Sequence, residues 1–508
     1  MKIAARSVGS ATNEAPEGAV IVASVATDAS SGASAATPRR AVRDVAVQLV
    51  ARAINLFLGV LVTAVVARAL GGSGFGVWST LLVVTQMAGF LADLGVEQVA
   101  VSRAAQDKRD REWIGALIVL RTLISLPATV VAGAVVLLLA SDDEMLACGL
   151  VLSATLLTAG PGSSRALLQL HLRNDLNMVV ITFNSLAWTA SAIVLAADDA
   201  GLVAFAVAFL AATWATTGVQ VAFAMRAGGV RLHGARRLLR PLAAAGIPVA
   251  VSGLLILAYA RIDQVLVYEL AGADEAGLYA VVYRVLEQAQ FVPITVATTF
   301  LPLVASAYEV DIAKARRMTQ LVLDHLAVAS FPAVGFALAA SEPVIELLFG
   351  RAFVEAAPAL PVLMGAFVVI CVGYLSGNLV IVLGLQRRFV VYAVAALVFN
   401  VGLNLALIPS YGFMAAAWVT LATEILVVGL TTAMVMRRMG HRPGLDRIVR
   451  AGLATLVMTL AVWGARQLGA GVLVLLLVGG VVYPVLAVLV RAVRIDELRA
   501  LASRREPI

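Results

Sequence analysis

Apolar residues occur in long runs along most of the chain, and the polar segments between these runs are short. A bilayer core about 30 Å thick needs roughly 20 apolar residues in a helix, and only helices or closed barrels satisfy the backbone there. The pattern therefore predicts an all-α polytopic membrane protein with about fourteen transmembrane helices. The predicted spans are residues 44–69, 74–97, 113–140, 144–169, 176–197, 201–225, 241–269, 276–306, 317–340, 359–385, 388–409, 412–436, 446–466 and 470–491.

The composition agrees with a single membrane unit. The 508 residues are 61% hydrophobic and 14% charged, and their mean hydropathy is +0.95. Soluble domains, in contrast, are about half apolar and about a quarter charged. The first 40 residues are rich in Ala, Ser, Thr and Gly, which predicts a disordered tail. Cys148 and Cys371 both lie inside apolar runs, which predicts small core residues and no disulfide or metal site.

Charged residues alternate between the two sides of the predicted membrane. Basic residues gather in every second polar segment, for example in 103–111, 226–240, 314–317 and 437–442. The intervening segments are mostly acidic, with Arg351 as their one clear basic residue. Because cytoplasmic loops carry an excess of Lys and Arg, this alternation predicts a multi-pass protein of the inner (plasma) membrane with both termini in the cytoplasm.

The two halves of the chain repeat each other. Residues 70–78 and 270–279 both form a glycine-rich turn followed by Gly, an aliphatic residue and an aromatic residue, and 173–201 is similarly echoed by 388–412. An even number of helices separates the copies, so they run parallel, as in some transporters. The predicted organisation is a tail (1–40), a six-helix lobe (41–226), a second six-helix lobe (241–437), two extra helices (446–491) and a tail (492–508).

Four short motifs occur in an order that resembles one protein family. The motifs are Ala67-Arg68-Ala69-Leu70-Gly71 with Gly74-Phe75-Gly76-Val77-Trp78, Arg261-Ile262-Asp263-Gln264 with Ala276-Gly277-Leu278-Tyr279-Ala280, Leu348-Phe349-Gly350-Arg351-Ala352-Phe353, and Asn400-Val401-Gly402-Leu403-Asn404 with Tyr411-Gly412. Over about residues 41 to 440, the chain resembles the Wzx-type polysaccharide flippases of the MOP superfamily.

This resemblance implies two six-helix lobes around a central cavity that opens alternately to either side, with two peripheral helices. It implies an undecaprenyl-diphosphate-linked oligosaccharide as cargo, moved from the inner to the outer leaflet for cell-surface polysaccharide biosynthesis. The expected partners are this substrate, membrane lipids, a glycan polymerase and glycosyltransferases, with no cofactor and a monomeric chain. The alternatives are a lipid II flippase and a multidrug or cation antiporter of the same superfamily.

Several arginines lie inside the predicted spans, where an ionisable side chain marks a pathway or an ion pair. A guanidinium group makes bidentate and permanently charged contacts to phosphate oxygens. These arginines are therefore predicted to bind the diphosphate of the cargo, together with one nearby amide. The predicted substrate-binding residues are Arg52, Asn55, Arg121, Arg261 and Arg284.

Structural roles for the same arginines stay open. Arg261 paired with Glu287, and Arg284 paired with Asp263, would hold the second lobe together instead of binding cargo. The long stem of Arg121 can reach the cytoplasmic interface. Arg52 has no acidic residue three or four positions further along, which favours its role as a ligand.

Acidic residues in the spans are candidates for proton or cation coupling, because a buried carboxylate changes charge with small changes in its surroundings. The coupling candidates are Asp263, Glu287, Asp324 and Glu424. A buried polar tie is an equal alternative for Glu424. Asp93 and Glu97 are expected to be hydrated or to cap a helix.

Motifs of other protein classes are absent from the sequence. There is no phosphate-binding P-loop, no nucleophile elbow and no metal-ligand spacing among the four histidines. A membrane glycosyltransferase or polymerase would need a large loop with catalytic acids, but the longest one, about residues 340–358, reads as an amphipathic connector. The sequence therefore predicts no enzyme activity. Topology and anionic lipid headgroups account for the basic loops without nucleic acid.

Overall fold

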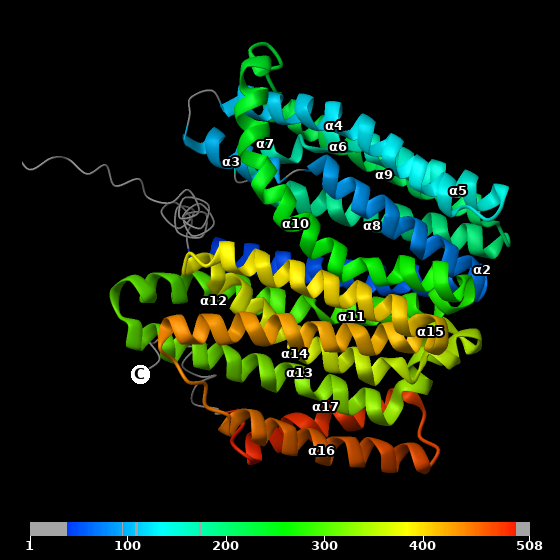
Figure 1. The fold of residues 1–508 in the computed structure, drawn as a ribbon, viewed down its shortest axis with the longest axis vertical. Coiled ribbons are helices and arrows are strands. Elements are labelled where there is room, and N and C mark those ends of the chain that lie inside the picture. Colours follow the sequence, from blue (N-terminus) through cyan, green and yellow to red (C-terminus); the bar gives the residue numbers. More distant parts are fainter. Residues whose placement is uncertain (1–37, 94, 107–109, 172–173, 494–508) are drawn as a thin grey trace, which may run out of the picture.

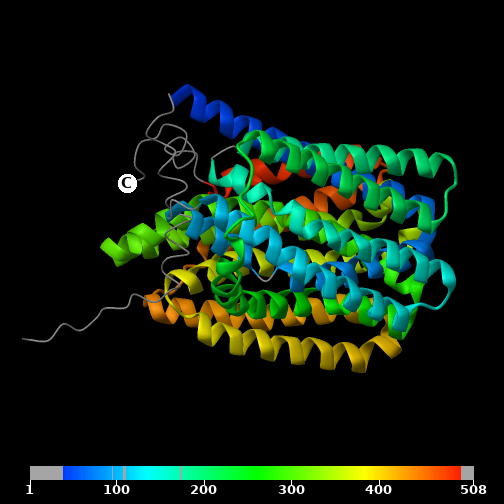
Figure 2. The same cartoon turned by 90° about the horizontal axis from the view of Figure 1, so that it is seen from above.

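The protein is a bundle of long helices. The computed structural model describes residues 38–93, 95–106, 110–171 and 174–493, and every regular element in these ranges is a helix. The long helices run side by side along one direction, with their connections at the two ends of the bundle (Figures 1 and 2). Ten helices in the described ranges are long and apolar enough to cross a membrane.

Most helices of the first half form the upper group in Figure 1, whereas the dark-blue first part of α2 lies lower, behind the yellow helix of the second half. One helix of this group is broken into α5, a 3-10 turn, α6 and α7. Pro161 and Gly162 lie at the break, where they interrupt the regular hydrogen bonds. The elements are α2 (Pro38–Asp93), α3 (Val96–Gln106), α4 (Asp110–Leu139), α5 (Asp143–Ser153), η2 (Ala154–Thr158), α6 (Ala159–Gly162), α7 (Arg165–Leu170), α8 (Asn174–Ala197) and α9 (Leu202–Arg226).

Helices of the second half form the lower group, and α16 and α17 pack beneath it against α13 (Figure 1). Helix α10 joins the groups, since it contacts α3 and α4 of the first and α11 and α15 of the second. The elements are α10 (Ala235–Ala271), α11 (Ala273–Ala289), α12 (Phe291–Val310), α13 (Ile312–Phe349), η3 (Arg351–Ala356), α14 (Ala359–Val382), α15 (Gln386–Met439), α16 (Asp446–Gln467) and α17 (Val472–Leu489).

Two helices exceed 50 residues because each contains a glycine with non-helical backbone angles. Gly71 divides the 56-residue α2 at φ 67°, and Gly412 divides the 54-residue α15 at φ 56°. Positive φ is nearly free of steric cost only for glycine. Both glycines lie at boundaries between predicted spans, so the sequence located these two turns correctly.

The repeated glycine turns of the two halves pack directly against each other. A Cβ atom added to Gly76 of α2 would lie 1.8 Å from the carbonyl oxygen of Ala273, and one added to Gly277 of α11 would lie 2.1 Å from that of Gly72. We call this end of the bundle the glycine end. We call the opposite end the arginine end, because α9 ends there at Arg226 and the last turn of α15 there contains Arg437 and Arg438. Backbones this close hold the two groups together at the glycine end.

Two further contacts join the groups at the glycine end. Phe75 meets Phe353 edge to face with ring centroids 6.1 Å apart. Arg68 donates a hydrogen bond of 2.5 Å to the carbonyl oxygen of Leu347, in the last turn of α13. A cation is favourable at this position because the final carbonyls of a helix carry partial negative charge.

Candidate functional site

A cluster of two arginines and one glutamate lies where the two groups of helices meet. Glu287 of α11 accepts hydrogen bonds from Arg261 of α10 and from Arg284 of α11, the latter at 2.9 Å. Arg284 Nε also donates to Thr63 Oγ1 of α2, 3.1 Å away. Helices from both groups therefore hold this cluster, which we call the arginine pair (Arg261 and Arg284, bridged by Glu287).

The arginine pair carries a net positive charge. Two guanidinium groups share one carboxylate, so one positive charge is not matched within the cluster. The Arg284 side chain is 39% exposed, whereas Glu287 is 17% exposed. The Arg261 guanidinium carbon lies 5.2 Å from the centre of the Tyr283 ring, in position for a cation–π contact that orients it. The unmatched charge favours an anion over a cation at this cluster, and Asp263 offsets part of it through its electrostatic interaction with Arg261.

The predicted ion pairs are correct in one case and wrong in the other. Arg261 pairs with Glu287, and Glu287 shares a helix face with Arg284, as their spacing of three residues indicates. Arg284 does not pair with Asp263, since Glu287 and Thr63 take its donors. Asp263 points into the second group and finds other partners there.

Arg52 lies on the face of α2 that meets α11. Residues 52, 59 and 63 fall within about 40° of one another around a helix of 3.6 residues per turn. A Cβ atom added to Gly59 would lie 3.3 Å from the Gln288 amide nitrogen, and Thr63 accepts from Arg284. Arg52 continues this stripe, about 16 Å from Thr63 along the helix axis, and in the described parts of the chain its partly exposed guanidinium makes no ion pair.

Asn55 holds α2 against α8. Its side-chain nitrogen donates to the carbonyl oxygen of Ala51 at 2.7 Å and to Thr182 Oγ1 at 3.0 Å. Its side-chain oxygen accepts from Ser185 Oγ at 2.6 Å. These three contacts occupy the amide, so the geometry gives Asn55 a packing role beside Arg52.

Asp263 is a buried carboxylate with three donors. Its side chain is reached by the Tyr279 hydroxyl of α11, by Thr420 Oγ1 of α15 at 3.1 Å and by the Gln264 backbone N–H at 2.8 Å. The residue is only 2% exposed. A buried carboxylate needs such donors, since an uncompensated charge in an apolar interior is very costly. These bonds tie α10, α11 and α15 together at one point.

Glu424 lies near Asp263 among tyrosines. It is within electrostatic range of Asp263 and of Tyr259, Tyr283 and Tyr374, which come from α10, α11 and α14. In the described ranges the half-buried Glu424 carboxylate accepts no hydrogen bond and makes no ion pair. We refer to Asp263, Glu424 and these tyrosines as the acidic cluster.

Asp324 is separate from both clusters. Arg447 of α16 lies 3.5 Å from its carboxylate, and Gln320 Nε2 donates to it at 2.8 Å. The contact joins α13 to α16, so it attaches the peripheral helices to the bundle.

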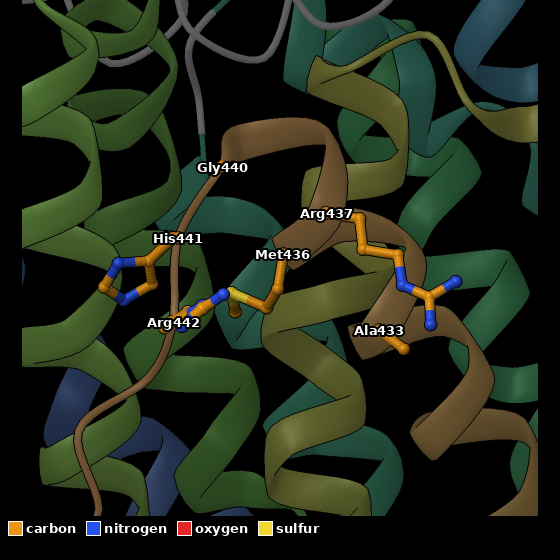
Figure 3. Close-up of a pocket in the computed structure, with 6 residues that line it drawn as sticks. All are labelled: Ala433, Met436, Arg437, Gly440, His441 and Arg442. Atoms are coloured by element: carbon orange, nitrogen blue, oxygen red, sulfur yellow. The ribbon is translucent and has the colours of Figure 1, made fainter.

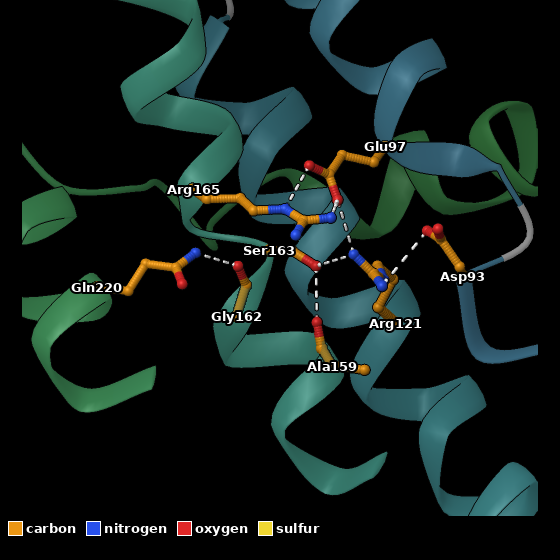
Figure 4. Close-up of polar contacts among 8 residues, drawn as sticks. All are labelled: Asp93, Glu97, Arg121, Ala159, Gly162, Ser163, Arg165 and Gln220. Carbon is orange, nitrogen blue, oxygen red and sulfur yellow. Dashed lines mark hydrogen bonds and ion pairs between the residues drawn. The ribbon is translucent and has the colours of Figure 1, made fainter. Parts of the chain in front are cut away.

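A second group of charges lies inside the first half of the bundle (Figure 4). Glu97 accepts from Arg121 at 2.9 Å and from Arg165 through two hydrogen bonds of 2.7 Å. Arg121 also lies 3.3 Å from Asp93 and donates to Ser163 at 3.0 Å. Two arginines and two acids balance here, and we call them the N-terminal ion-pair cluster.

This cluster corrects two expectations. Arg121 does not reach toward an interface, because it is 8% exposed and its guanidinium is held by acids. Glu97 is neither hydrated nor a simple helix cap, since it is 5% exposed and bridges two arginines. The cluster stands beside the break in α5–α7, where Gln220 donates to the carbonyl oxygen of Gly162 and so satisfies backbone freed by the break.

Sequence reasoning missed several residues of these clusters. Arg165 lies inside the predicted span 144–169, so a complete count of charges within spans would have found it. Tyr279 and Tyr283 precede Glu287 by eight and four residues, which places all three on one helix face. Thr420 gave no such signal. No group of His, Cys, Asp and Glu suited to a metal ion occurs among the residues with described positions.

The sequence model of the polysaccharide biosynthesis protein family matches residues 65–358, more than half of the chain. The chain belongs to this family. Family membership implies, in general terms, a lipid-linked glycan as substrate. Among curated protein sequences, none matches this polysaccharide biosynthesis protein.

Solved structures share its fold. The lipid II flippase MurJ in an inward closed conformation has a TM-score of 0.68 at 13% identity, over 87% of this chain and 98% of MurJ. An inward-facing MATE family multidrug resistance transporter of the MOP superfamily has a TM-score of 0.61 at 15% identity, over 76% and 94%. A MOP superfamily transporter from Pyrococcus furiosus reaches 0.55 at 15% identity, over 77% and 93%.

Together these findings place the polysaccharide biosynthesis protein among multi-pass membrane proteins with the MOP fold. This assignment rests on the family model for the family and on the solved structures for the fold.

Proposed function

We propose that this protein is a flippase for an undecaprenyl-diphosphate-linked oligosaccharide, which it moves from the inner to the outer leaflet of the plasma membrane. The arginine pair supports this proposal most directly, because two guanidinium groups sharing one carboxylate leave a positive charge between the two halves of the bundle. Arg52, which makes no ion pair with the described residues, adds a second positive charge on the face of α2 that meets α11. A diphosphate is an anion that such a surface would bind.

The proposed topology has fourteen crossings and both termini in the cytoplasm. The breaks at Gly71 and Gly412 support it, since each divides a helix of more than 50 residues into two crossings. Two six-helix lobes, residues 41–226 and 241–437, then surround the cargo path, and 446–491 add two peripheral helices. The arginine end faces the cytoplasm and the glycine end faces outward, in accord with the excess of arginine in cytoplasmic loops.

The proposed transport cycle opens the two ends in turn. The close packing of Gly76 and Gly277 with the opposite lobe supports a state whose outer end is shut. Releasing the cargo outward requires these backbones to separate. The hydrogen bonds of Arg68 to Leu347 and of Arg284 to Thr63 join different helices across the lobes, so both must break or shift in that step.

The acidic cluster is proposed to couple transport to an ion gradient. Asp263 and Glu424 are two carboxylates within electrostatic range of each other inside the second lobe. Taking up a proton or a cation would relieve their repulsion. Glu287 belongs to the same hypothesis, because any change in its charge would free the arginine pair. Asp324 has weaker support, since it is held by the peripheral helix α16.

A multidrug or cation antiporter is the second candidate, and the acidic cluster is the observation that favours it. A cationic drug would need a path with net negative charge, however, and the arginine pair and Arg52 give the interlobe face the opposite sign. The Pyrococcus furiosus structure is described as having a binding pocket of reverse polarity that suggests a different function, so the shared fold accommodates either sign.

Export of lipid-linked glycan in reconstituted vesicles tests this proposal. Arg284→Gln removes one member of the arginine pair and the bond to Thr63, and we expect it to lower the transport rate at least ten-fold. Arg466→Gln is the matched control, because Arg466 also pairs with one glutamate, Glu342, but lies on the peripheral helix α16. Equal transport by both variants would exclude the arginine pair from the cargo path.

A further inference from the structure

A basic cavity lies at the arginine end of the second lobe, apart from the clusters described above (Figure 3). It has a volume of about 460 Å³, which is within the range of small-molecule sites. The last turn of α15 and the loop after it form its walls, with Arg437 and His441 on opposite sides and Arg442 between them. Its lining residues are Ala433, Met436, Arg437, Gly440, His441 and Arg442, none of which is acidic.

Hydrogen bonds to α13 fix the loop that forms this cavity. Gln320 accepts from the Gly444 N–H at 2.9 Å and donates to the Gly444 carbonyl oxygen at 3.0 Å. The same side-chain oxygen lies 3.2 Å from His441 Nε2. Arg316 donates to the carbonyl oxygen of Met439 at 2.7 Å. The backbone that carries the basic side chains is therefore held in place before any ligand binds.

The described neighbours of the cavity do not neutralise its basic groups. Across the described ranges, the guanidinium groups of Arg437 and Arg442 make no hydrogen bond and no ion pair. Asp324 of α13 is already engaged by Arg447 and Gln320, and in the described ranges Asp446, four residues after Arg442, makes no ion pair with Arg437 or Arg442. Burial and the neighbouring Arg316 lower the pKa of His441. In the described ranges an anion would therefore meet two guanidinium groups without other partners, beside the imidazole of His441.

An apolar surface leads directly into the cavity. Leu430 and Ala433 precede Arg437 by seven and four residues, so all three lie on one face of α15. Leu430 is 39% exposed and Ala433 is also exposed. At the start of α16, close in sequence to the cavity residue Arg442, Leu445 and Val449 are exposed apolar side chains. A ligand with a phosphate at one end and a hydrocarbon chain at the other fits this arrangement.

We propose that this cavity binds the headgroup of an anionic phospholipid, with an acyl chain along Leu430 and Ala433 of α15. The phosphate lies between Arg437 and Arg442, where basic pockets at the cytoplasmic side of membrane helices bind such headgroups. The proposed topology assigns the lipid to the cytoplasmic leaflet. Binding at this site would join the second lobe to the peripheral helices, because the loop after Met439 connects them. A soluble phosphate shares the charge but leaves the apolar face uncovered.

Lipid binding to the purified full chain in detergent, followed by native mass spectrometry, tests the site. The probes are dioleoylphosphatidylglycerol, dioleoylphosphatidylcholine and inorganic phosphate. We expect preferential binding of phosphatidylglycerol, and a loss of about 25-fold in its affinity in the variant Arg437→Gln with Arg442→Gln, since each arginine contributes about five-fold. Arg437→Lys with Arg442→Lys keeps both charges and should retain most of the binding, which separates a loss of the site from a loss of folding.

The control Arg438→Gln with Arg226→Gln removes the same charge from two exposed arginines that also end helices but lie outside the cavity. We expect it to change the affinity less than three-fold. An equal loss in both glutamine variants would show a diffuse surface attraction and overturn the site. Equal binding of the two lipids, or phosphate binding as tight as phosphatidylglycerol, would also overturn it. The assay contains no glycan, so its failure would leave the proposed cargo untouched.

Discussion

Replacing Gly76 by alanine should open the glycine end of the protein. The new methyl group would lie 1.8 Å from the Ala273 carbonyl oxygen, where ordinary contacts begin at 3.4 Å, so the backbones must separate by about 1.6 Å. Overpacking of this kind costs about 1–3 kcal/mol. The atoms that clash belong to the backbone of both helices, which cannot move aside as a flexible side chain can, so we expect the cost of Gly76→Ala to be near 3 kcal/mol. If separation of the lobes relieves the strain, the population with an open glycine end rises roughly 100-fold.

Distances between two spin labels, measured by double electron–electron resonance, test this shift toward an open glycine end. Spin labels at Ser141 and Glu355, which are both exposed at the glycine end on opposite halves of the chain, report the separation of the lobes. We expect a longer distance to dominate in Gly76→Ala. Gly429→Ala is the control, because a Cβ atom there meets nothing within 4 Å. An unchanged distance distribution in Gly76→Ala, with normal thermal stability, would refute the reasoning.

Three further predictions concern the acidic residues. Glu97→Gln should destabilise the fold by about 3 kcal/mol, because it removes the carboxylate that Arg121 and Arg165 share and leaves the buried Arg121 with its longer contact to Asp93, and thermal unfolding in detergent measures this. Tyr279→Phe should cost about 1–2 kcal/mol, because Asp263 loses a donor, and the same assay applies. Glu424→Gln should make transport in vesicles independent of an applied proton or sodium gradient, whereas Asp324→Asn should keep that dependence.

Each of these outcomes has a clear opposite. An unchanged melting temperature in the glutamine variant at 97 would mean that the N-terminal ion-pair cluster contributes little stability. A similar result for the phenylalanine variant would mean that other donors satisfy Asp263. If the variant at 424 kept gradient-dependent transport while that at 324 lost it, the coupling group would lie at the contact between α13 and α16.

Much of the fold could be predicted from local patterns. The glycine turn after Leu70 and the turn at Gly412 are visible in the sequence because only glycine adopts positive φ readily. The repeat predicted that the turns around Gly76 and Gly277 are equivalent. Only the structure revealed that these turns contact each other. Spacing along one helix also predicted that Arg284 and Glu287 share a face.

Partners that are distant in sequence could not be predicted in the same way. Glu97 and Arg165 are 68 residues apart, and their contact depends on how α7 packs against α3. Asp263 takes donors from α11 and α15, the latter from Thr420, 157 residues away. Helix spacing restricts which residues share a face, but it does not determine which neighbouring helix that face meets. The expected pair of Arg284 with Asp263 failed for this reason.

Binding of undecaprenyl diphosphate to the purified protein in lipid nanodiscs tests the central claim most directly. If guanidinium groups between the lobes hold the diphosphate, the wild-type chain should bind undecaprenyl diphosphate at least ten-fold more tightly than undecaprenyl monophosphate, and Arg52→Gln with Arg284→Gln should remove that preference. Equal affinity for the two lipids, or a preference that survives both substitutions, would contradict the account.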